Sequence, residues 1–278
     1  MNLLRSYEKR LQQFRTMVND PDAMTLNEAK LANMSRIHHK LSVEEDRLKE
    51  FAAFYDLTEA EAQNTQSVEH KDKLHDLFDS VETDQGLLQN YRNARLFYTA
   101  RMQLAYTRFP VAYKLLRYFN ALYPKKKRRA VRVLDYGCGV GDYGLAFALH
   151  GYSVTLLDIE GGNLDFAKWR FEKRSLPHQV IAANEENLYP SLGEQTIVLS
   201  GEVLEHVRDP LTVLKNTKNC LMPGGYFWYS GYPDYEREVG GDHLQEAADV
   251  RLEALDYVMQ HFKPATRLQL PGTLMKKR

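Results

Sequence analysis

Three things are scarce or missing in this chain of 278 residues, and each absence excludes a class of protein. The chain has only two cysteines, Cys138 and Cys220, which is typical of a reducing compartment without disulfides. No stretch is apolar for the length that a transmembrane helix needs. The opening residues MNLLRSYEKR are charged and no long apolar run follows them, which is unlike a secretory leader. These absences predict a cytoplasmic protein that does not bind a membrane.

Excess charge is also missing, because 37 basic residues balance 37 acidic ones, but the two signs are separated along the chain. Residues 41–90 hold thirteen acids and four bases, whereas residues 91–129 hold eleven bases and no acid. Nine aromatic residues are interleaved with those bases, a pattern that suits binding of nucleic acid or of an anionic small molecule. The alternative is that the acidic block folds against the basic block within one helical domain. The neutral overall charge favours this alternative.

Strand signals are almost absent from the first 124 residues, which predicts an all-α N-terminal domain over residues 1–124. Three residue pairs in it have the Ser/Thr-x-x-Glu pattern of a helix capping box. These pairs are Thr25 with Glu28, Ser42 with Glu45, and Thr58 with Glu61. Later helices are expected over residues 71–78, 85–106 and 111–122. A charged linker, residues 125–129, opens a second domain over residues 125–278.

A different pattern begins in the second domain at Val131. The apolar residues Val131, Val133 and Leu134 predict a strand that ends at Asp135. Glycines follow at alternate positions (Gly137, Gly139 and Gly141), and an apolar pattern typical of a helix comes after them. A strand, a glycine turn and a helix in this order indicate a nucleotide-type ligand at the helix N-terminus.

The glycine spacing narrows the choice of ligand. A dinucleotide site has the spacing G-x-G-x-x-G, because the pyrophosphate needs backbone N–H groups at those positions. The three glycines here follow G-x-G-x-G, and Asp142 comes directly after the last one. Its negative charge would repel a pyrophosphate, whereas a ligand with a cationic centre and no phosphate could bind beside it. S-adenosylmethionine (SAM), which carries a sulfonium, is such a ligand.

Four more strands are expected in alternation with helices, which predicts a parallel sheet. They are residues 153–157, 180–183, 197–199 and 226–229. Asp158 follows the second strand of the domain and Asn184 the third. The fourth strand is followed by Glu205-His206-Val207, and the fifth is preceded by Pro223-Gly224-Gly225.

Over roughly residues 131–262, these motifs resemble the class I SAM-dependent methyltransferases, and the EHV and PGG motifs are similar to the ubiquinone-biosynthesis O-methyltransferase branch. The resemblance implies an α/β fold, a Rossmann-like class I methyltransferase sheet with helices on both faces, preceded by the all-α domain. It further implies that Asp158 binds the ribose, that Asn184 contacts the adenine, and that Asp135 and Gly201 lie near the methionine. The expected cofactor-binding residues are Asp135, Gly137, Cys138, Gly139, Gly141, Asp158, Ile159, Asn184, Glu185 and Gly201.

The methyl acceptor is expected near Glu202, Glu205 and His206, which a helical turn would place on one face. His243 follows the next strand in a glycine-containing loop. Together these two carboxylates and two imidazoles can hold a divalent metal such as Mg²⁺. The E-x-x-E-H pattern also resembles the metal site of the ubiquinone O-methyltransferases and of the small-RNA 2′-O-methyltransferases. Alternatively, His206 acts with Glu205 as the catalytic base without a metal, or the cluster is structural.

The helical domain can roof the active site or form a homodimer interface. We expect Tyr91, Arg92, Tyr98 and Arg101 to face the substrate or the cofactor. Residues 231–242 form a polar loop without an apolar membrane-docking insert, which favours a small polar acceptor. The sequence therefore predicts SAM-dependent O-methylation of a small polar metabolite. The alternatives are an RNA 2′-O-methyltransferase that uses the basic segment, and a non-catalytic SAM-binding regulatory protein.

The end of the chain carries weaker signals. A helix is expected over residues 252–262 and a strand over residues 266–270. Only residues 271–278 then remain for a seventh strand, so we expect the last hairpin to be abbreviated or missing.

Overall fold

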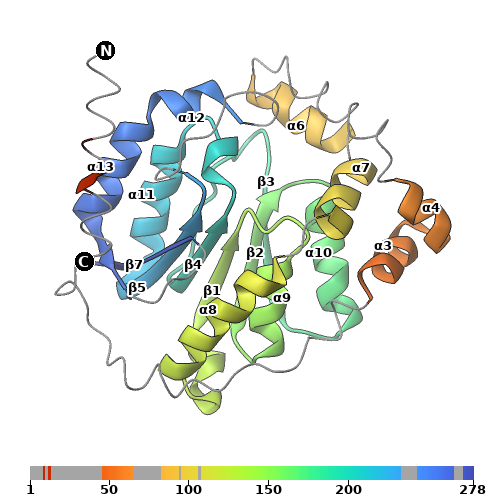
Figure 1. Ribbon diagram of the computed structural model, residues 1–278, viewed down its shortest axis with the longest axis horizontal. Coiled ribbons are helices and arrows are strands. Elements are labelled where there is room, and N and C mark those ends of the chain that lie inside the picture. Colours follow the sequence, from red (N-terminus) through yellow and green to blue (C-terminus); the bar gives the residue numbers. More distant parts are fainter. Residues whose placement is uncertain are drawn as a thin grey trace. The chain divides into compact units, whose positions relative to one another are not determined.

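The architecture comes from a computed structural model that describes residues 9, 12–13, 46–65, 83–93, 95–105, 108–232, 243–265 and 272–278 (Figure 1). Its strands form a seven-stranded mixed sheet in the order β3-β2-β1-β4-β5-β7-β6. The predicted Rossmann-like α/β fold is confirmed. Within the described residues, no helix combines the length and apolar character needed to cross a membrane. The chain divides into two compact units, residues 33–190 and residues 1–32 with 191–278.

Residues 33–190 contain three parallel strands and the helices that connect them. The strands are β1 (Arg132–Tyr136), β2 (Ser153–Ile159) and β3 (His178–Ala183), and most residues of β1 and β2 are buried. Burial of consecutive residues is typical of parallel strands that are covered on both faces. Helix α9 (Asp142–Leu149) follows β1 and helix α10 (Gly162–Lys173) follows β2, as in a βαβ unit.

Every described element before β1 is helical, as predicted. These elements are α3 (Arg47–Tyr55), α4 (Glu59–Asn64), α6 (Asp84–Asn93), α7 (Arg95–Ala100), the π-helix η3 (Arg101–Ala105), α8 (Phe109–Leu122) and the 3₁₀ helix η4 (Lys125–Ala130). The capping box of Thr58 and Glu61 is confirmed, since Glu61 donates its N–H to the Thr58 hydroxyl and its carboxylate accepts the Thr58 N–H. The other two predicted boxes and the helix over residues 71–78 lie outside the described residues. The boundary between residues 124 and 125 stays a prediction.

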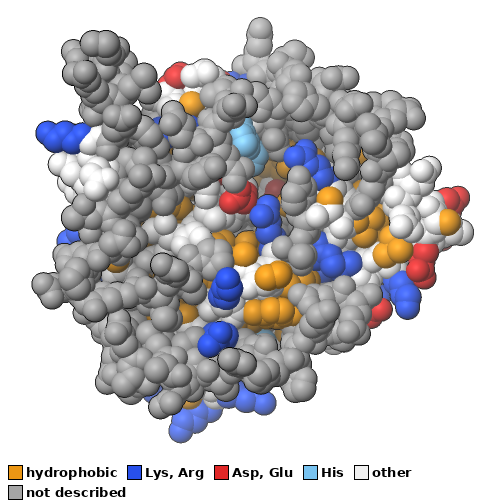
Figure 2. Space-filling view, in the orientation of Figure 1, with side chains coloured by type: hydrophobic (Ala, Val, Ile, Leu, Met, Phe, Trp, Pro, Cys, Tyr) orange, Lys and Arg blue, Asp and Glu red, His pale blue; other side chains and the backbone are white. Residues whose placement is uncertain are grey.

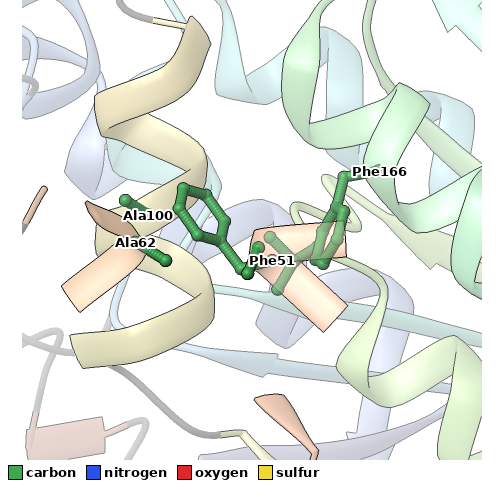
Figure 3. Packing of buried hydrophobic residues seen from close by; sticks show 6 residues of the cluster. Phe51, Ala62, Ala100 and Phe166 are labelled. Atoms are coloured by element: carbon green, nitrogen blue, oxygen red, sulfur yellow. The ribbon is translucent and has the colours of Figure 1, made fainter. Parts of the chain in front are cut away.

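The N-terminal helices pack directly on the α/β part of their unit. Phe51 of α3 and Phe166 of α10 lie with their ring centroids 6.4 Å apart, and Ala100 of α7 belongs to the same buried cluster (Figure 3). The cluster also contains Val140, a residue of the glycine turn. Burial of these apolar groups stabilises the unit by about 25 cal/mol per Å² removed from water. The glycine turn therefore shares a hydrophobic core with α3.

Described charged residues from both blocks pair with the α/β part of their unit. Arg92 lies 3.5 Å from Glu160 and 3.0 Å from Glu185, in the segments after β2 and β3. From the acidic block, Glu50 lies 3.1 Å from Arg170 of α10. Most acids of the acidic block lie outside the described residues, so the interpretation in which it folds against the basic block stays a prediction.

Residues 191–278 contain the remaining strands. Strand β4 (Gln195–Gly201) is parallel to β5 (Leu221–Ser230), and between them lie the 3₁₀ turn η5 (Leu204–His206) and α11 (Pro210–Cys220). The Asp209 side chain accepts the Thr212 N–H at 2.9 Å and caps α11. Helices α12 (Gln245–Asp249) and α13 (Arg251–His261) precede β6 (Phe262–Pro264) and β7 (Thr273–Lys277).

The last hairpin is present but short, since β6 has three residues and β7 has five, so the expectation of an abbreviated hairpin is confirmed and that of a missing one is wrong. Strand β7 is present and antiparallel to both β5 and β6, with Leu274 opposite Trp228 and Met275 opposite Phe227. Met275 is fully buried, so its hydrophobic contacts hold a strand that is too short to be evident from local pattern. The strand expected over residues 266–270 lies outside the described residues.

Candidate functional site

The glycine turn between β1 and α9 has a backbone shape that requires its glycines. Gly137, Gly139 and Gly141 have φ angles of 66°, 52° and 79°, a region that side-chain-bearing residues rarely adopt. Cys138 donates its N–H to Leu157 O at 2.9 Å, which ties the turn to the end of β2. The predicted strand, turn and helix are thus confirmed.

Asp135 is buried beneath this turn, with 1% of its surface exposed. Its Oδ2 accepts the Gly144 N–H at 2.7 Å and so satisfies a backbone donor in the first turn of α9. Burial raises the pKa of this carboxyl well above its usual range, although the Gly144 hydrogen bond opposes the shift. Contact between Asp135 and the methionine ammonium stays a prediction.

Gly144 is a tightly packed residue of α9 that the sequence interpretation does not include. A Cβ added there would lie 2.8 Å from Leu156 Cδ2 and 3.0 Å from Asp135 Oδ2, so only glycine lets α9 approach β2 this closely. Gly139, Gly141 and Gly144 also form the G-x-G-x-x-G spacing of dinucleotide sites. The glycine spacing by itself therefore does not exclude a dinucleotide, contrary to the expectation from Gly137, Gly139 and Gly141 alone.

The Asp142 carboxylate does not present a free negative charge to the ligand, contrary to what its position after the glycines predicts. Its carboxylate is 2% exposed and pairs with Arg170 at 2.8 Å and with Arg47 at 2.8 Å. Burial alone would raise its pKa, but the two guanidinium groups outweigh burial and hold the pKa below its usual range. Because these arginines neutralise the carboxylate, it supplies no reason for the site to reject a pyrophosphate. Arg170 and Arg47 gave no sequence signal of this role.

Asp158 stands at the carboxyl end of β2, as predicted. Its Oδ2 accepts the Gly139 N–H at 2.6 Å and its Oδ1 accepts the Ile159 N–H at 2.8 Å. Burial raises the pKa of Asp158 to about 6, against the lowering effect of these two hydrogen bonds. The carboxyl therefore titrates near neutral pH.

The residues after β3 are engaged in local and cross-element contacts. Asn184 Oδ1 accepts the N–H groups of Glu186 and Asn187 at 3.1 and 3.0 Å, which stabilises a tight turn. Glu185 accepts from Arg92, which also pairs with Glu160. Contact of Asn184 with the adenine and of Glu185 with the cofactor stays a prediction. The ion pair of Glu160 with Arg92 is a further contact that the sequence does not predict.

The segment over residues 91–105 lies against the glycine turn and the start of α10. The Met102 methyl group is 3.4 Å from the position of a Cβ on Gly139, and Thr99 donates to Asn163 Oδ1 at 2.8 Å. Two of the predicted substrate residues, Tyr91 and Tyr98, have their rings in edge contact at 5.0 Å. The other two are Arg92, which forms the ion pairs above, and Arg101, which begins the π-helix η3. The π-helix brings Met102 to the turn.

The second unit carries a compact group of possible metal ligands. Each of Glu205, His206 and His243 offers one ligand atom, and these atoms lie within 4.8 Å of one another. The imidazole centroids are 5.0 Å apart. A Cβ on Gly231 would lie 2.7 Å from Glu205 Oε1, so this glycine leaves room for the carboxylate. Three of the four predicted ligands are thus brought together.

Glu202, the fourth predicted ligand, is absent from this group of described residues. It has a φ of 58° and its Oε1 accepts the Ser230 hydroxyl at 2.8 Å. The helical turn expected from Glu202 to His206 is wrong, because the 3₁₀ turn η5 begins only at Leu204. Gly201 is the last residue of β4, and its contact with the methionine stays a prediction.

Comparisons with known proteins relate the sequence of this chain to methyltransferases. A family model described as "Methyltransferase domain" matches residues 104–270. The ubiquinone biosynthesis O-methyltransferase of Coxiella burnetii is 36% identical over 98 residues, which are 35% of this chain and 42% of the relative. That of Dinoroseobacter shibae is 37% identical over 97 residues, 35% of this chain and 39% of the relative. The chain thus spans about two fifths of the length of these relatives.

Among solved structures, the T. thermophilus 16S rRNA N2 G1207 methyltransferase in complex with AdoMet and guanosine is similar to part of the chain. It is 17% identical, and the likeness covers 61% of this chain and 43% of that one with a TM-score of 0.44.

Proposed function

We propose that this chain, which belongs to the methyltransferase-domain family and to its SAM-dependent enzymes, methylates an oxygen atom of a small polar metabolite. The observation that carries the proposal is the hydrogen bond between Asp158 and the glycine turn. The relatives add to it, because their name specifies O-methylation. Oxygen as the nucleophile rests on that name. The polar residues 231–242 favour a soluble acceptor over a lipid-anchored one.

On the donor side, we assign ribose binding to Asp158. An ionised carboxylate accepts hydrogen bonds from both ribose hydroxyls, and its bond to Gly139 fixes its orientation before the ligand arrives. The left-handed glycines allow the ligand to approach the backbone without a Cβ in the way. These contacts align the sulfonium, and alignment is a large part of the rate enhancement in bimolecular transfers.

On the acceptor side, we assign proton removal to His206, with Glu205 as its partner. The acceptor oxygen forms a bond to the methyl carbon while the carbon–sulfur bond breaks, and the sulfonium leaves as a neutral thioether. The hydroxyl proton passes to the imidazole of His206. A neutral imidazole is suited to this step near pH 7.

The cluster of Glu205, His206 and His243 also fits a divalent cation. Metal–ligand bonds of about 2.0–2.2 Å place two ligands at most about 4.4 Å apart, so ligand atoms within 4.8 Å of one another need only small side-chain movements to share an ion. Two imidazoles and one carboxylate suit Mn²⁺, Fe²⁺, Co²⁺ or Zn²⁺ better than Mg²⁺, which prefers oxygen ligands. When bound, such an ion lowers the pKa of a coordinated hydroxyl.

Two variants separate the metal hypothesis from the base hypothesis. If a metal is required, His243→Ala and His206→Ala abolish methyl transfer alike, and elemental analysis finds the metal only in the native chain. If His206 acts as a base without a metal, His206→Ala is inactive while His243→Ala retains activity after chelation. Equal activity of both variants and the native chain would reject both roles.

The substrate class is tested with radiolabelled SAM and a panel of hydroxylated acceptors. Small polar catechols and hydroxy acids are compared with a prenylated phenol in detergent. Transfer to the polar compounds supports the proposal. Transfer restricted to the prenylated phenol contradicts the polar acceptor while leaving O-methylation intact.

RNA 2′-O-methylation is a second candidate, and one observation favours it. The side chains of Lys125, Lys126, Lys127 and Arg129 are exposed, and Figure 2 shows Lys and Arg side chains projecting at the lower edge of the face, beneath α8. Against it, Phe109, Tyr118 and Phe119 are fully buried and cannot stack on bases. RNA binding that weakens steeply with salt would favour this candidate over the metabolite.

A further inference from the structure

Arg170 of α10 is a wholly buried charged residue that bonds to the glycine turn. Its Nη1 donates to Val140 O at 2.6 Å and to Asp142 Oδ1 at 2.8 Å, and its Nε donates to Glu50 Oε2 at 3.1 Å. We infer that Arg170 is a positioning residue for SAM, which holds the turn in the shape that binds the cofactor. This inference rests on the proposed SAM site and adds to it a residue that does not touch the ligand.

The turn needs such support because glycine has little backbone preference of its own. Three of its five residues from Gly137 to Gly141 are glycines with positive φ, and each has an unusually wide choice of conformations when unrestrained. Hydrogen bonds from outside the turn must therefore select one shape.

The contact with Arg170 completes the restraint of the peptide group between Val140 and Gly141. The Gly141 N–H donates to Cys138 O at 2.8 Å, while the Val140 carbonyl accepts from Arg170. Because a peptide group is planar, bonds at both ends fix its orientation. The preceding Gly139 N–H is held by Asp158. The glycine turn is thus held by Asp158 of β2 at the Gly139 N–H and by Arg170 of α10 at the Val140 carbonyl.

Arg170 is itself oriented by two N-terminal helices and by a neighbour on its own helix. Its guanidinium carbon lies 5.6 Å from the ring centroid of Phe166 and 5.9 Å from that of Phe109. The carboxylate of Glu50, on α3, is fully buried and pairs with it. Through this pair, α3 contributes to the shape of a turn that lies about ninety residues further along the chain.

Arginine is required for this arrangement, whereas stability alone would not require a charge. A buried ion pair is often no more stabilising than apolar residues of similar volume. The planar guanidinium can donate to a carbonyl and two carboxylates at once, and a lysine or an apolar side chain cannot reproduce this geometry. We therefore infer that the charge of Arg170 serves to orient the Val140 carbonyl and the Asp142 carboxylate.

The test compares Arg170→Lys with Arg174→Lys in the full chain. Arg174 is the matched control, since it lies on the same helix and pairs with the same Glu50 carboxylate, but its other bond goes to Arg170 O. Hydrogen exchange of the turn amides is measured in the ligand-free chain, and SAM affinity is measured by calorimetry. Arg170→Lys is expected to speed exchange at Gly139 and Gly141 and to weaken SAM binding about tenfold, the effect of losing one hydrogen bond to a charged group.

The control variant Arg174→Lys is expected to change neither quantity by more than about twofold, within the usual range for a partly exposed pair. If Arg170→Lys only lowers thermal stability and leaves exchange and SAM affinity as in Arg174→Lys, the inference is wrong. If Arg170→Lys does not fold, Arg170→Gln, which keeps an N–H donor, is tested in the same way. Failure of the native chain to bind SAM would overturn the proposed function, whereas unchanged exchange of the turn amides would overturn the role of Arg170.

Discussion

The raised pKa of Asp158 makes SAM affinity depend on pH in a range where it can be measured. A carboxyl with a pKa of about 6 is ionised in about a tenth of molecules at pH 5 and in about nine tenths at pH 7. Ribose hydroxyls donate to the ionised form, so binding requires that the proton leave. We therefore expect the dissociation constant of SAM to fall about tenfold from pH 5 to pH 7.

The sign of this effect follows from the direction of the shift. The folded, ligand-free chain holds the proton more tightly than an ordinary aspartate does, and SAM competes with that proton. Near pH 6, binding should therefore release about half a proton per site. Calorimetric titrations at pH 5, 6 and 7, in two buffers that differ in ionisation enthalpy, measure both the affinity and the proton release.

The matched control is Asp158→Asn. The amide oxygen of asparagine can still accept the Gly139 N–H, so the turn keeps its contact with this position while the titrating group is gone. SAM affinity of the variant should be lower than that of the native chain at pH 7 and nearly constant with pH. A native affinity that is flat from pH 5 to pH 7, or a pH dependence of equal size in the variant, would refute ribose binding by Asp158.

Three further predictions concern stability. Glu50→Gln removes the buried carboxylate that pairs with Arg170 and should lower the free energy of unfolding in urea by about 3 kcal/mol, whereas Glu172→Gln, in an exposed pair, should change it by less than about 0.5 kcal/mol. Gly144→Ala gains about 1 kcal/mol of helix propensity but forces a Cβ into packed atoms, so we expect a net loss and a lower melting temperature by calorimetry. Thr58→Ala should destabilise the start of α4 by about 1 kcal/mol, seen as faster local hydrogen exchange.

The parts of the fold that could be predicted from the sequence depend on residues close together in the chain. The strand before Asp135 and the glycine turn were evident because their pattern lies within about ten residues. The capping box of Thr58 and Glu61 spans four residues, and its prediction is confirmed. Local sterics and local hydrogen bonds decide these features, so a single sequence contains the information.

The parts that could not be predicted depend on long-range contacts. The bond between Arg170 and Glu50 joins residues 120 positions apart, and an arginine in a helix is usually exposed. Asp142 was assigned a role toward the ligand because its arginine partners could not be seen. Gly144 is a different case, since its spacing from Gly139 and Gly141 can be seen in the sequence alone.

Strand β7 has a consequence for how the chain folds during synthesis. It lies between β5 and β6 in the sheet although it comes after both in the chain, so β5 keeps an unpaired edge until residues 273–277 have left the ribosome. That edge carries Phe227 and Trp228, which are fully buried once β7 is in place. An exposed strand edge with large apolar side chains is a site for pairing with another chain. Nascent chains that pause before β7 are therefore expected to depend on chaperones more than completed ones.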